Sequence, residues 1–181
     1  MNIFLQGPRN IGKSTVILKT LEIIMTGKSL TLGGFFTWNG GKTDPHVYMR
    51  PAHSNADAEV YRLASYDAEK GGLICNTQAF EEDGVRLLSG SKGADLIVMD
   101  ELGFLESGAA AFRQAVLDVL SSDIPVLGAI RLGDVPWLEG IRRDPTVSLF
   151  DVDEKTRGIL PRELAAALSA VIIRLKHHYF R

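Results

Sequence analysis

The sequence predicts an α/β domain in which helices cover both faces of a mostly parallel central sheet. Short apolar runs typical of fully buried strands alternate along the chain with longer segments of helical periodicity. The first apolar run leads through a glycine-rich turn directly into a helical segment. No internal repeat or low-complexity segment interrupts this alternation, so residues 1–181 are expected to form a single domain.

The first half of the chain is expected to contain four strands and one helix. Short apolar or alternating runs mark the strands, and apolar side chains recurring every three or four residues mark the helix. In chain order these elements are a strand at Asn2–Gln6, a helix at Ser14–Met25, and strands at Gly33–Trp38, His46–Ala52 and Glu59–Asp67. The last two strands are typical of a hairpin or meander and predict a small β-hairpin insertion around residues 46–67.

The second half continues the alternation and ends in a long helix. In chain order we expect a helix at Phe80–Gly93, a strand at Asp95–Asp100, a helix at Ser107–Ser121, strands at Pro125–Ile130 and Val147–Val152, and a helix at Leu160–Phe180. Gly84 is a weak point of its helix, because glycine lowers helix propensity. Pro161 suits the first turn of the last helix, where its missing N–H has no intrahelical partner.

Composition excludes several classes of protein. The chain is 45% hydrophobic and 23% charged, with a net charge of −2, so it has no basic field that would attract nucleic acid or an anionic membrane. No apolar run approaches the length of a membrane span, and no leader pattern precedes the first strand, which favours the cytoplasm. Cys75 is the only cysteine, so an internal disulfide is impossible and a zinc site is not expected.

The turn after the first strand fits the pattern G-x-x-x-x-G-K-[ST] at every fixed position. Glycines allow backbone N–H groups to wrap a phosphate chain, and the N-terminus of the following helix attracts its negative charge. The residues expected to bind the phosphates are Gly7, Pro8, Arg9, Asn10, Ile11, Gly12, Lys13, Ser14 and Thr15. Among them Lys13 would reach the β- and γ-phosphates, and the Ser14 hydroxyl would bind Mg²⁺.

A nucleotide hydrolase also needs carboxylates opposite this phosphate loop, and the segment ADLIVMDELGFLE supplies them. Asp100 ends an apolar strand, at the sheet edge where ligands bind in such folds, and can hold Mg²⁺. Glu101 can orient or deprotonate an attacking water. Glu106 suits either the site or the dipole of the next helix, and the sequence favours neither.

Four segments together resemble the THEP-type nucleoside-triphosphatases, the family that includes the cancer-related nucleoside-triphosphatase. They are GPRNIGKST, GGFFT, IVMDELGFLE and DEKTRGILPREL, in the order and at the spacing that the family shows. The resemblance implies a three-layer, RecA-like P-loop NTPase domain that hydrolyses ATP, GTP and other nucleoside triphosphates with Mg²⁺. It also implies that Lys13 and Glu101 are catalytic, that Ser14 and Asp100 serve the metal, and that Arg157 lies near the nucleotide.

The chain also departs from the family pattern. Asn10 replaces a common glycine of the phosphate loop, and Trp38–Lys42 replaces a segment that usually contains an acidic residue and an arginine. The expected partner is therefore ATP or GTP, with the base left open. Nucleic acid is not an expected partner, and a monomer is favoured.

Two other functions remain open at this point. A P-loop nucleoside or small-metabolite kinase could use a lid containing Arg131, Arg142 and Arg143 to clamp phosphates. A non-catalytic nucleotide-dependent switch could use the irregular Trp38–Ala58 segment as its moving part.

Overall fold

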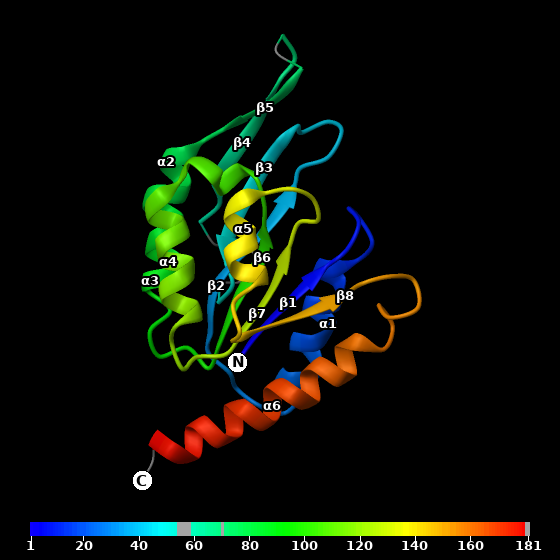
Figure 1. Cartoon of the computed structure of the whole chain (residues 1–181), viewed down its shortest axis with the longest axis vertical. Helices are drawn as coiled ribbons and strands as arrows, with labels where there is room; N and C mark the ends of the chain where they lie inside the picture. Colours follow the sequence, from blue (N-terminus) through cyan, green and yellow to red (C-terminus); the bar gives the residue numbers. More distant parts are fainter. Residues whose placement is uncertain (54–58, 70, 180–181) are drawn as a thin grey trace.

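The computed structural model describes residues 1–53, 59–69 and 71–179. These residues form one eight-stranded sheet in the order β5-β4-β3-β2-β6-β7-β1-β8 (Figure 1). The strands are β1 (Asn2–Gln6), β2 (Leu32–Asn39), β3 (His46–Pro51), β4 (Tyr61–Asp67), β5 (Gly72–Cys75), β6 (Leu96–Leu102), β7 (Val126–Ile130) and β8 (Val147–Asp151). The pairs β2–β6, β6–β7, β7–β1 and β1–β8 are parallel, which confirms the predicted sheet. The pairs β2–β3, β3–β4 and β4–β5 are antiparallel.

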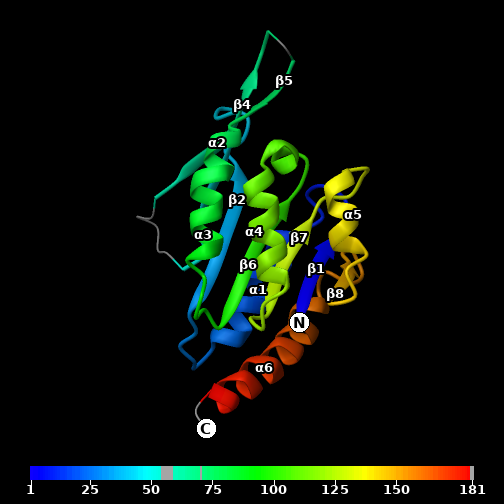
Figure 2. The ribbon, with the colours of Figure 1, turned by 60° about the vertical axis from the view of Figure 1, so that its left-hand side comes forward.

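Helices cover both faces of this sheet, as predicted. One face carries α1 and α6, and the other carries α3, α4 and α5 (Figures 1 and 2). The helical segments are α1 (Lys13–Met25), α2 (Thr77–Ala79), the π-helical η1 (Phe80–Gly84), α3 (Val85–Ser89), the 3₁₀-helical η2 (Leu105–Gly108), α4 (Ala110–Leu120), α5 (Pro136–Arg142) and α6 (Leu160–Tyr179). Within the described residues, no helix combines the length and apolar character needed to cross a bilayer.

The sheet separates two apolar cores. On the side of α3 and α4, the rings of Phe35 and Phe80 both pack against Phe112, with centroid separations of 5.7 and 5.3 Å. On the other side, Ile17 of α1 and Leu168 of α6 belong to the second core. All five side chains are at most 1% exposed, so the three layers are held by well-buried apolar contacts.

The predicted hairpin is part of the central sheet and is larger than expected. β3 pairs with β2, β4 pairs with β3, and a third strand, β5, pairs with β4. The sequence did not reveal β5 because it has four residues and none of them is fully buried. In both views β4 and β5 extend beyond the layers of helices (Figures 1 and 2). Residues 54–58 of the expected hairpin and of the Trp38–Ala58 segment lie outside the described residues.

Two predicted helices differ in detail from the structure. The helix expected at Phe80–Gly93 begins at Thr77, and its weak point at Gly84 coincides with the π-helical turn η1. A Cβ atom at Gly84 would lie 2.6 Å from the Phe112 ring, so the absence of a side chain allows this turn to pack closely against α4. The helix expected from Ser107 begins at Ala110, because the preceding residues form the 3₁₀ turn η2.

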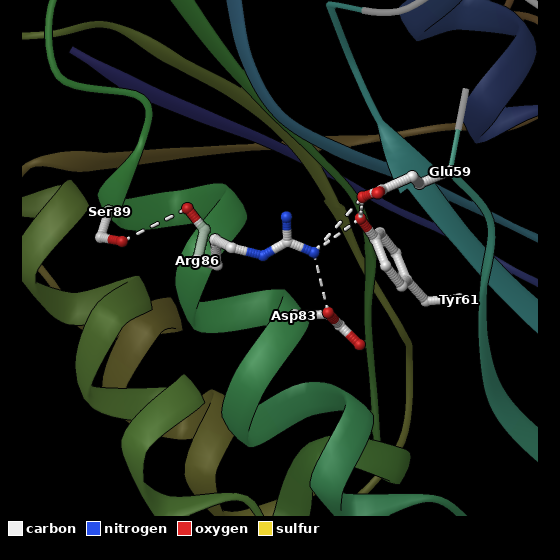
Figure 3. Close-up of polar contacts among 5 residues, drawn as sticks. All are labelled: Glu59, Tyr61, Asp83, Arg86 and Ser89. Carbon is white, nitrogen blue, oxygen red and sulfur yellow. Dashed lines mark hydrogen bonds and ion pairs between the residues drawn. The ribbon is translucent and has the colours of Figure 1, made fainter. Parts of the chain in front are cut away.

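A polar cluster joins the antiparallel strands to the helical layer (Figure 3). The Arg86 guanidinium donates hydrogen bonds to Asp83 at 2.9 Å and to the Tyr61 hydroxyl at 2.8 Å, and lies 3.4 Å from a Glu59 carboxylate oxygen. Tyr61 also donates to Glu59, and the Ser89 hydroxyl donates to the Arg86 carbonyl at 3.3 Å. The cluster therefore fixes the start of β4 against α3.

Candidate active site

The candidate site lies at the sheet edge where three parallel strands end. Strands β1, β7 and β6 are neighbours in that order, so their C-terminal ends share one edge. The phosphate-loop sequence follows β1, while Asp100 and Glu101 lie near the end of β6. A cleft of about 450 Å³ opens between the loop and these carboxylates. Segments far apart in the sequence thus meet as predicted from their strands.

The phosphate loop has the backbone that its residue types favour. Gly12 has a φ of 110° and lies just before α1, a conformation that is strained for residues with a Cβ atom. Asn10 has a φ of 63°, and asparagine is one of the few other residues that tolerate this left-handed region. Asn10 therefore retains the loop shape at a position where the family commonly has glycine.

Gly7 is required for a different reason, which is close approach of a neighbouring loop. A Cβ atom at Gly7 would lie 2.6 Å from the Val152 carbonyl oxygen. The Val152 N–H donates to the Gln6 carbonyl at 2.8 Å, so the segment after β8 is fixed against the start of the phosphate loop.

The first hydrogen bond of α1 is donated by the Val16 N–H to the Gly12 carbonyl, so the N–H groups of the preceding helix residues have no partner within the helix.

Lys13 is a buried cation that lies across the phosphate loop. Its side chain is 5% exposed, and its Nζ donates to the carbonyl oxygens of Gly7 and Pro8 at 3.0 and 3.2 Å. The same Nζ lies 3.2 Å from a carboxylate oxygen of Glu101. The lysine therefore links the two halves of the site, and its positive charge is available to the cleft.

Ser14 and Asp100 form a second link across the cleft. The Ser14 hydroxyl donates to Asp100 Oδ1 at 3.1 Å. Burial raises the pKa of Asp100 to about 7, although the Ser14 hydrogen bond and the Lys13 charge both lower it. Glu101, as a neighbouring negative charge, raises this pKa further. The two oxygens thus face each other in a site that favours an added cation.

Glu101 is held by its backbone while its side chain faces the cleft. Its N–H donates to the Thr37 hydroxyl at 3.0 Å, which ties the end of β6 to β2. Its side chain is 31% exposed, so solvent can reach the carboxylate. This combination of a fixed backbone and a reachable carboxylate suits a group that positions water.

Glu106 also lines the cleft and is almost completely buried. Its carboxylate accepts a hydrogen bond from the Gly103 N–H at 2.9 Å. Burial raises the pKa of Glu106 to about 7, against the lowering effect of that hydrogen bond and of the Arg131 charge. The structure therefore places Glu106 in the lining of the cleft, within the 3₁₀ turn η2 that precedes α4.

The structure brings most of the predicted residues to the cleft. The predicted residues that line it are Arg9, Asn10, Gly12, Lys13, Ser14, Thr15, Asp100 and Glu101. Gly7, Pro8 and Ile11 belong to the same loop but do not line the cleft. Arg157 is exposed in the turn between β8 and α6, outside the lining residues, and its contact with nucleotide stays a prediction.

Several residues of the cleft were not predicted. Thr37 belongs to the GGFFT segment, so the resemblance contained a signal for it, but only the structure shows that it holds Glu101. Phe104 belongs to the DELGFLE segment, and Leu73 comes from the unpredicted strand β5. Arg131 lines the cleft as well, whereas Arg142 and Arg143 do not.

The residues present fit a magnesium ion that completes its coordination with phosphate and water. The described part of the chain contains no group of three or more His, Cys, Asp and Glu side chains placed to hold a metal by themselves. Magnesium is usually bound through one or two protein oxygens together with substrate phosphates. The facing oxygens of Ser14 and Asp100 would supply those protein ligands.

A model of the family described as NTPase matches residues 2–165 of the chain. The chain belongs to the NTPase family. Nucleoside-triphosphatase THEP1 of Methanosarcina barkeri is 30% identical to this NTPase over 169 residues, which are 91% of this chain and 95% of that protein. Nucleoside-triphosphatase THEP1 of Thermofilum pendens is 29% identical over 180 residues, which are 96% and 98% of the two chains. The predicted resemblance is thereby confirmed.

A solved structure shows the same fold. The crystal structure of THEP1 from Aquifex aeolicus superposes on this NTPase with a TM-score of 0.76 and 23% sequence identity. The superposition covers 93% of this chain and 99% of that one. At this identity the likeness establishes the fold alone, and the predicted P-loop NTPase fold is confirmed.

Proposed function

We propose that this NTPase is a Mg²⁺-dependent nucleoside-triphosphatase that releases phosphate from ATP or GTP and leaves the diphosphate. The observation that carries the proposal is the position of Lys13, between the phosphate loop and Glu101, in the same cleft as the Ser14–Asp100 pair. The names of the THEP1 relatives point to the same activity. Because base contacts leave no motif in the sequence, the proposal extends to both nucleotides.

In the proposed reaction, the phosphate loop with Lys13, the Glu101 carboxylate and the Ser14–Asp100 pair have separate roles. The loop N–H groups and Lys13 bind the β- and γ-phosphates, and Lys13 exchanges its present partners, two carbonyl oxygens and the Glu101 carboxylate, for the phosphate oxygens. This exchange releases Glu101 from Lys13, so that its carboxylate can accept a hydrogen bond from the attacking water. Ser14 and Asp100 would hold Mg²⁺, which neutralises phosphate charge when it is bound.

The proposal is tested by measuring diphosphate and free phosphate after incubation with ATP, GTP, CTP or UTP. We expect equal molar release of both products from ATP and GTP in the presence of Mg²⁺, and none after removal of the metal with a chelator. Release that persists after chelation would contradict the metal dependence. No release from any of the four nucleotides, with nucleotide still bound, would contradict the hydrolase assignment.

One observation favours a second candidate function, transfer of the γ-phosphate to a small acceptor. A second, mainly apolar pocket of about 320 Å³ adjoins the cleft, and Asn39 and Leu73 line both. Of the arginines expected in a kinase lid, Arg142 and Arg143 pair with Glu139 on α5 and do not line the cleft. Following a radiolabelled γ-phosphate separates the two functions: a hydrolase returns the label as free phosphate, whereas a kinase retains it on an organic product.

A further inference from the structure

Arg131 lies between the two halves of the site. It directly follows β7, the strand that separates the phosphate-loop strand β1 from the carboxylate strand β6. Its backbone is fixed on both sides, because its N–H donates to the Leu102 carbonyl at 2.9 Å and its carbonyl accepts from the Arg142 guanidinium at 2.6 Å. The side chain therefore starts from a rigid point at the edge of the cleft that it lines.

The Arg131 side chain rests on an aromatic ring. Its guanidinium carbon lies 4.8 Å from the centroid of the Phe104 ring, a cation–π arrangement. The segment that carries Phe104 is itself anchored, because the Trp137 indole N–H donates to the Gly103 carbonyl at 2.8 Å. Phe104 thus gives the flexible arginine side chain a defined direction before any substrate is bound.

The side-chain hydrogen-bond donors of Arg131 have no partner within the described part of the chain. Among the described residues, no carboxylate lies within ion-pair distance of its guanidinium, and no side-chain hydrogen bond is formed by it. The two neighbouring arginines differ, since Arg142 and Arg143 reach Glu139 oxygens at 2.5 and 3.8 Å. Arg131 therefore presents a planar set of unpaired donors to a cleft built to hold phosphates.

These observations identify a role for Arg131 that rests on the proposed hydrolase function. We propose that Arg131 is a catalytic residue that contacts the γ-phosphate oxygens in the transition state, with Phe104 as its positioning residue. Water oxygen attacks the γ-phosphorus, the bond to the β–γ bridging oxygen breaks, and the electron pair leaves with the diphosphate. Glu101 accepts the proton of the water, and Arg131 keeps its own proton throughout.

Substitution of Arg131 tests this role. We expect Arg131→Ala to lower kcat by about 10³-fold, as for arginines that stabilise phosphoryl transfer. KM and the affinity for ADP should change by less than about threefold, because the contact is made in the transition state. Arg131→Lys should recover little activity, since an ammonium lacks the planar fork. Arg143→Ala is the matched control and should retain wild-type kcat, because this side chain is 82% exposed and its one ion pair among the described residues is with Glu139.

Two further measurements separate catalysis from folding. Free guanidinium added to Arg131→Ala should restore part of kcat, which a merely misfolded variant would not show. Phe104→Leu should lower kcat by roughly tenfold while leaving ADP affinity unchanged, because it removes the ring but keeps an apolar contact.

The possible outcomes distinguish a wrong role for Arg131 from a wrong hydrolase assignment. If the wild-type chain hydrolyses nucleotide and Arg131→Ala keeps the same kcat, the role of Arg131 is wrong while the function stands. If Arg131→Ala loses ADP binding together with kcat and guanidinium restores neither, Arg131 is a structural residue and the proposal also fails. If the wild-type chain hydrolyses none of the nucleotides, the proposed function fails first.

Discussion

Lys13 makes three of the polar contacts of the site with one buried ammonium group. Its three donors are shared among two loop carbonyls and the Glu101 carboxylate, all within 3.2 Å. A lysine buried to this extent is stable only with such partners, because an unpaired buried charge is strongly unfavourable. A triphosphate offers stronger acceptors at the same place, so the residue is arranged to exchange partners.

Lys13→Ala should therefore abolish tight nucleotide binding. We expect the affinity for ATP to fall by about 100-fold or more, since charge-assisted hydrogen bonds to phosphate are lost. Titration of the variant with a fluorescent ATP analogue measures this change. Lys19→Ala, on an exposed position of the same helix, should bind as the wild type does. Unchanged affinity in Lys13→Ala would show that the phosphate loop is not the nucleotide site.

Glu106 predicts a pH dependence of stability. Burial raises its pKa from 4.5 to about 7, so the folded protein holds this proton where the unfolded chain releases it. The wild type therefore loses stability as pH rises from about 4.5 to 7, by about 3 kcal/mol at most at 1.36 kcal/mol per pKa unit. Below this window the group contributes no difference, and above it the loss is constant.

Glu106→Gln removes that titration but keeps an oxygen that can accept the Gly103 N–H. Its unfolding free energy should match that of the wild type near pH 4.5 and exceed it increasingly up to pH 7. Denaturant unfolding of both proteins across this range measures the difference. A difference that does not vary with pH would show that Glu106 titrates normally in the folded protein.

At the scale of elements, η1 shows how a helix deviates where another helix passes close to it. Gly84 ends this π-helical turn, and its missing side chain is what allows contact with Phe112 of α4. The adjacent α3 then carries Arg86, which holds the start of β4 (Figure 3). Arg86 therefore connects the helical layer with the antiparallel strands.

Gly84→Ala should destabilise the protein although alanine favours helices. The added methyl group would meet the buried Phe112 ring, and overpacking of this kind costs about 1–3 kcal/mol. Urea unfolding measures the effect. Gly140→Ala in α5 is the matched control, because its Cβ would meet nothing within 4 Å, and it should be neutral or stabilising by up to about 1 kcal/mol. Equal behaviour of both variants would contradict the packing argument.

At the scale of the whole molecule, the order of strands decides which residues share the site. The sequence predicted the α/β alternation, the phosphate loop and Asp100 with Glu101, because these depend on local patterns and on strand ends. It could not predict that β7 lies between β1 and β6, since adjacency in a sheet is set by tertiary packing. From the sequence, Arg131 was therefore only a candidate lid residue of the alternative kinase function, and the structure shows that it lines the cleft.

The outer strands were only partly predictable for a related reason. β3 has alternating buried side chains and β4 has two fully buried residues, and both were expected as strands, whereas β5 has four residues of which none is fully buried. The contribution of Leu73 to the cleft depends on β5 pairing with β4, a contact that no local pattern encodes. Thr37 lay in a recognised segment, but its hydrogen bond to Glu101 appears only in the assembled sheet.

The most direct test of the central claim is a comparison of phosphate release by the wild type and by Glu101→Gln, with ATP binding measured in parallel. Glutamine keeps the shape of the side chain but cannot accept a proton from water. We predict that the variant binds ATP at least as tightly as the wild type and releases phosphate at least about 100-fold more slowly. Equal turnover in the two proteins would show that Glu101 does not position the attacking water and would contradict the account of this site.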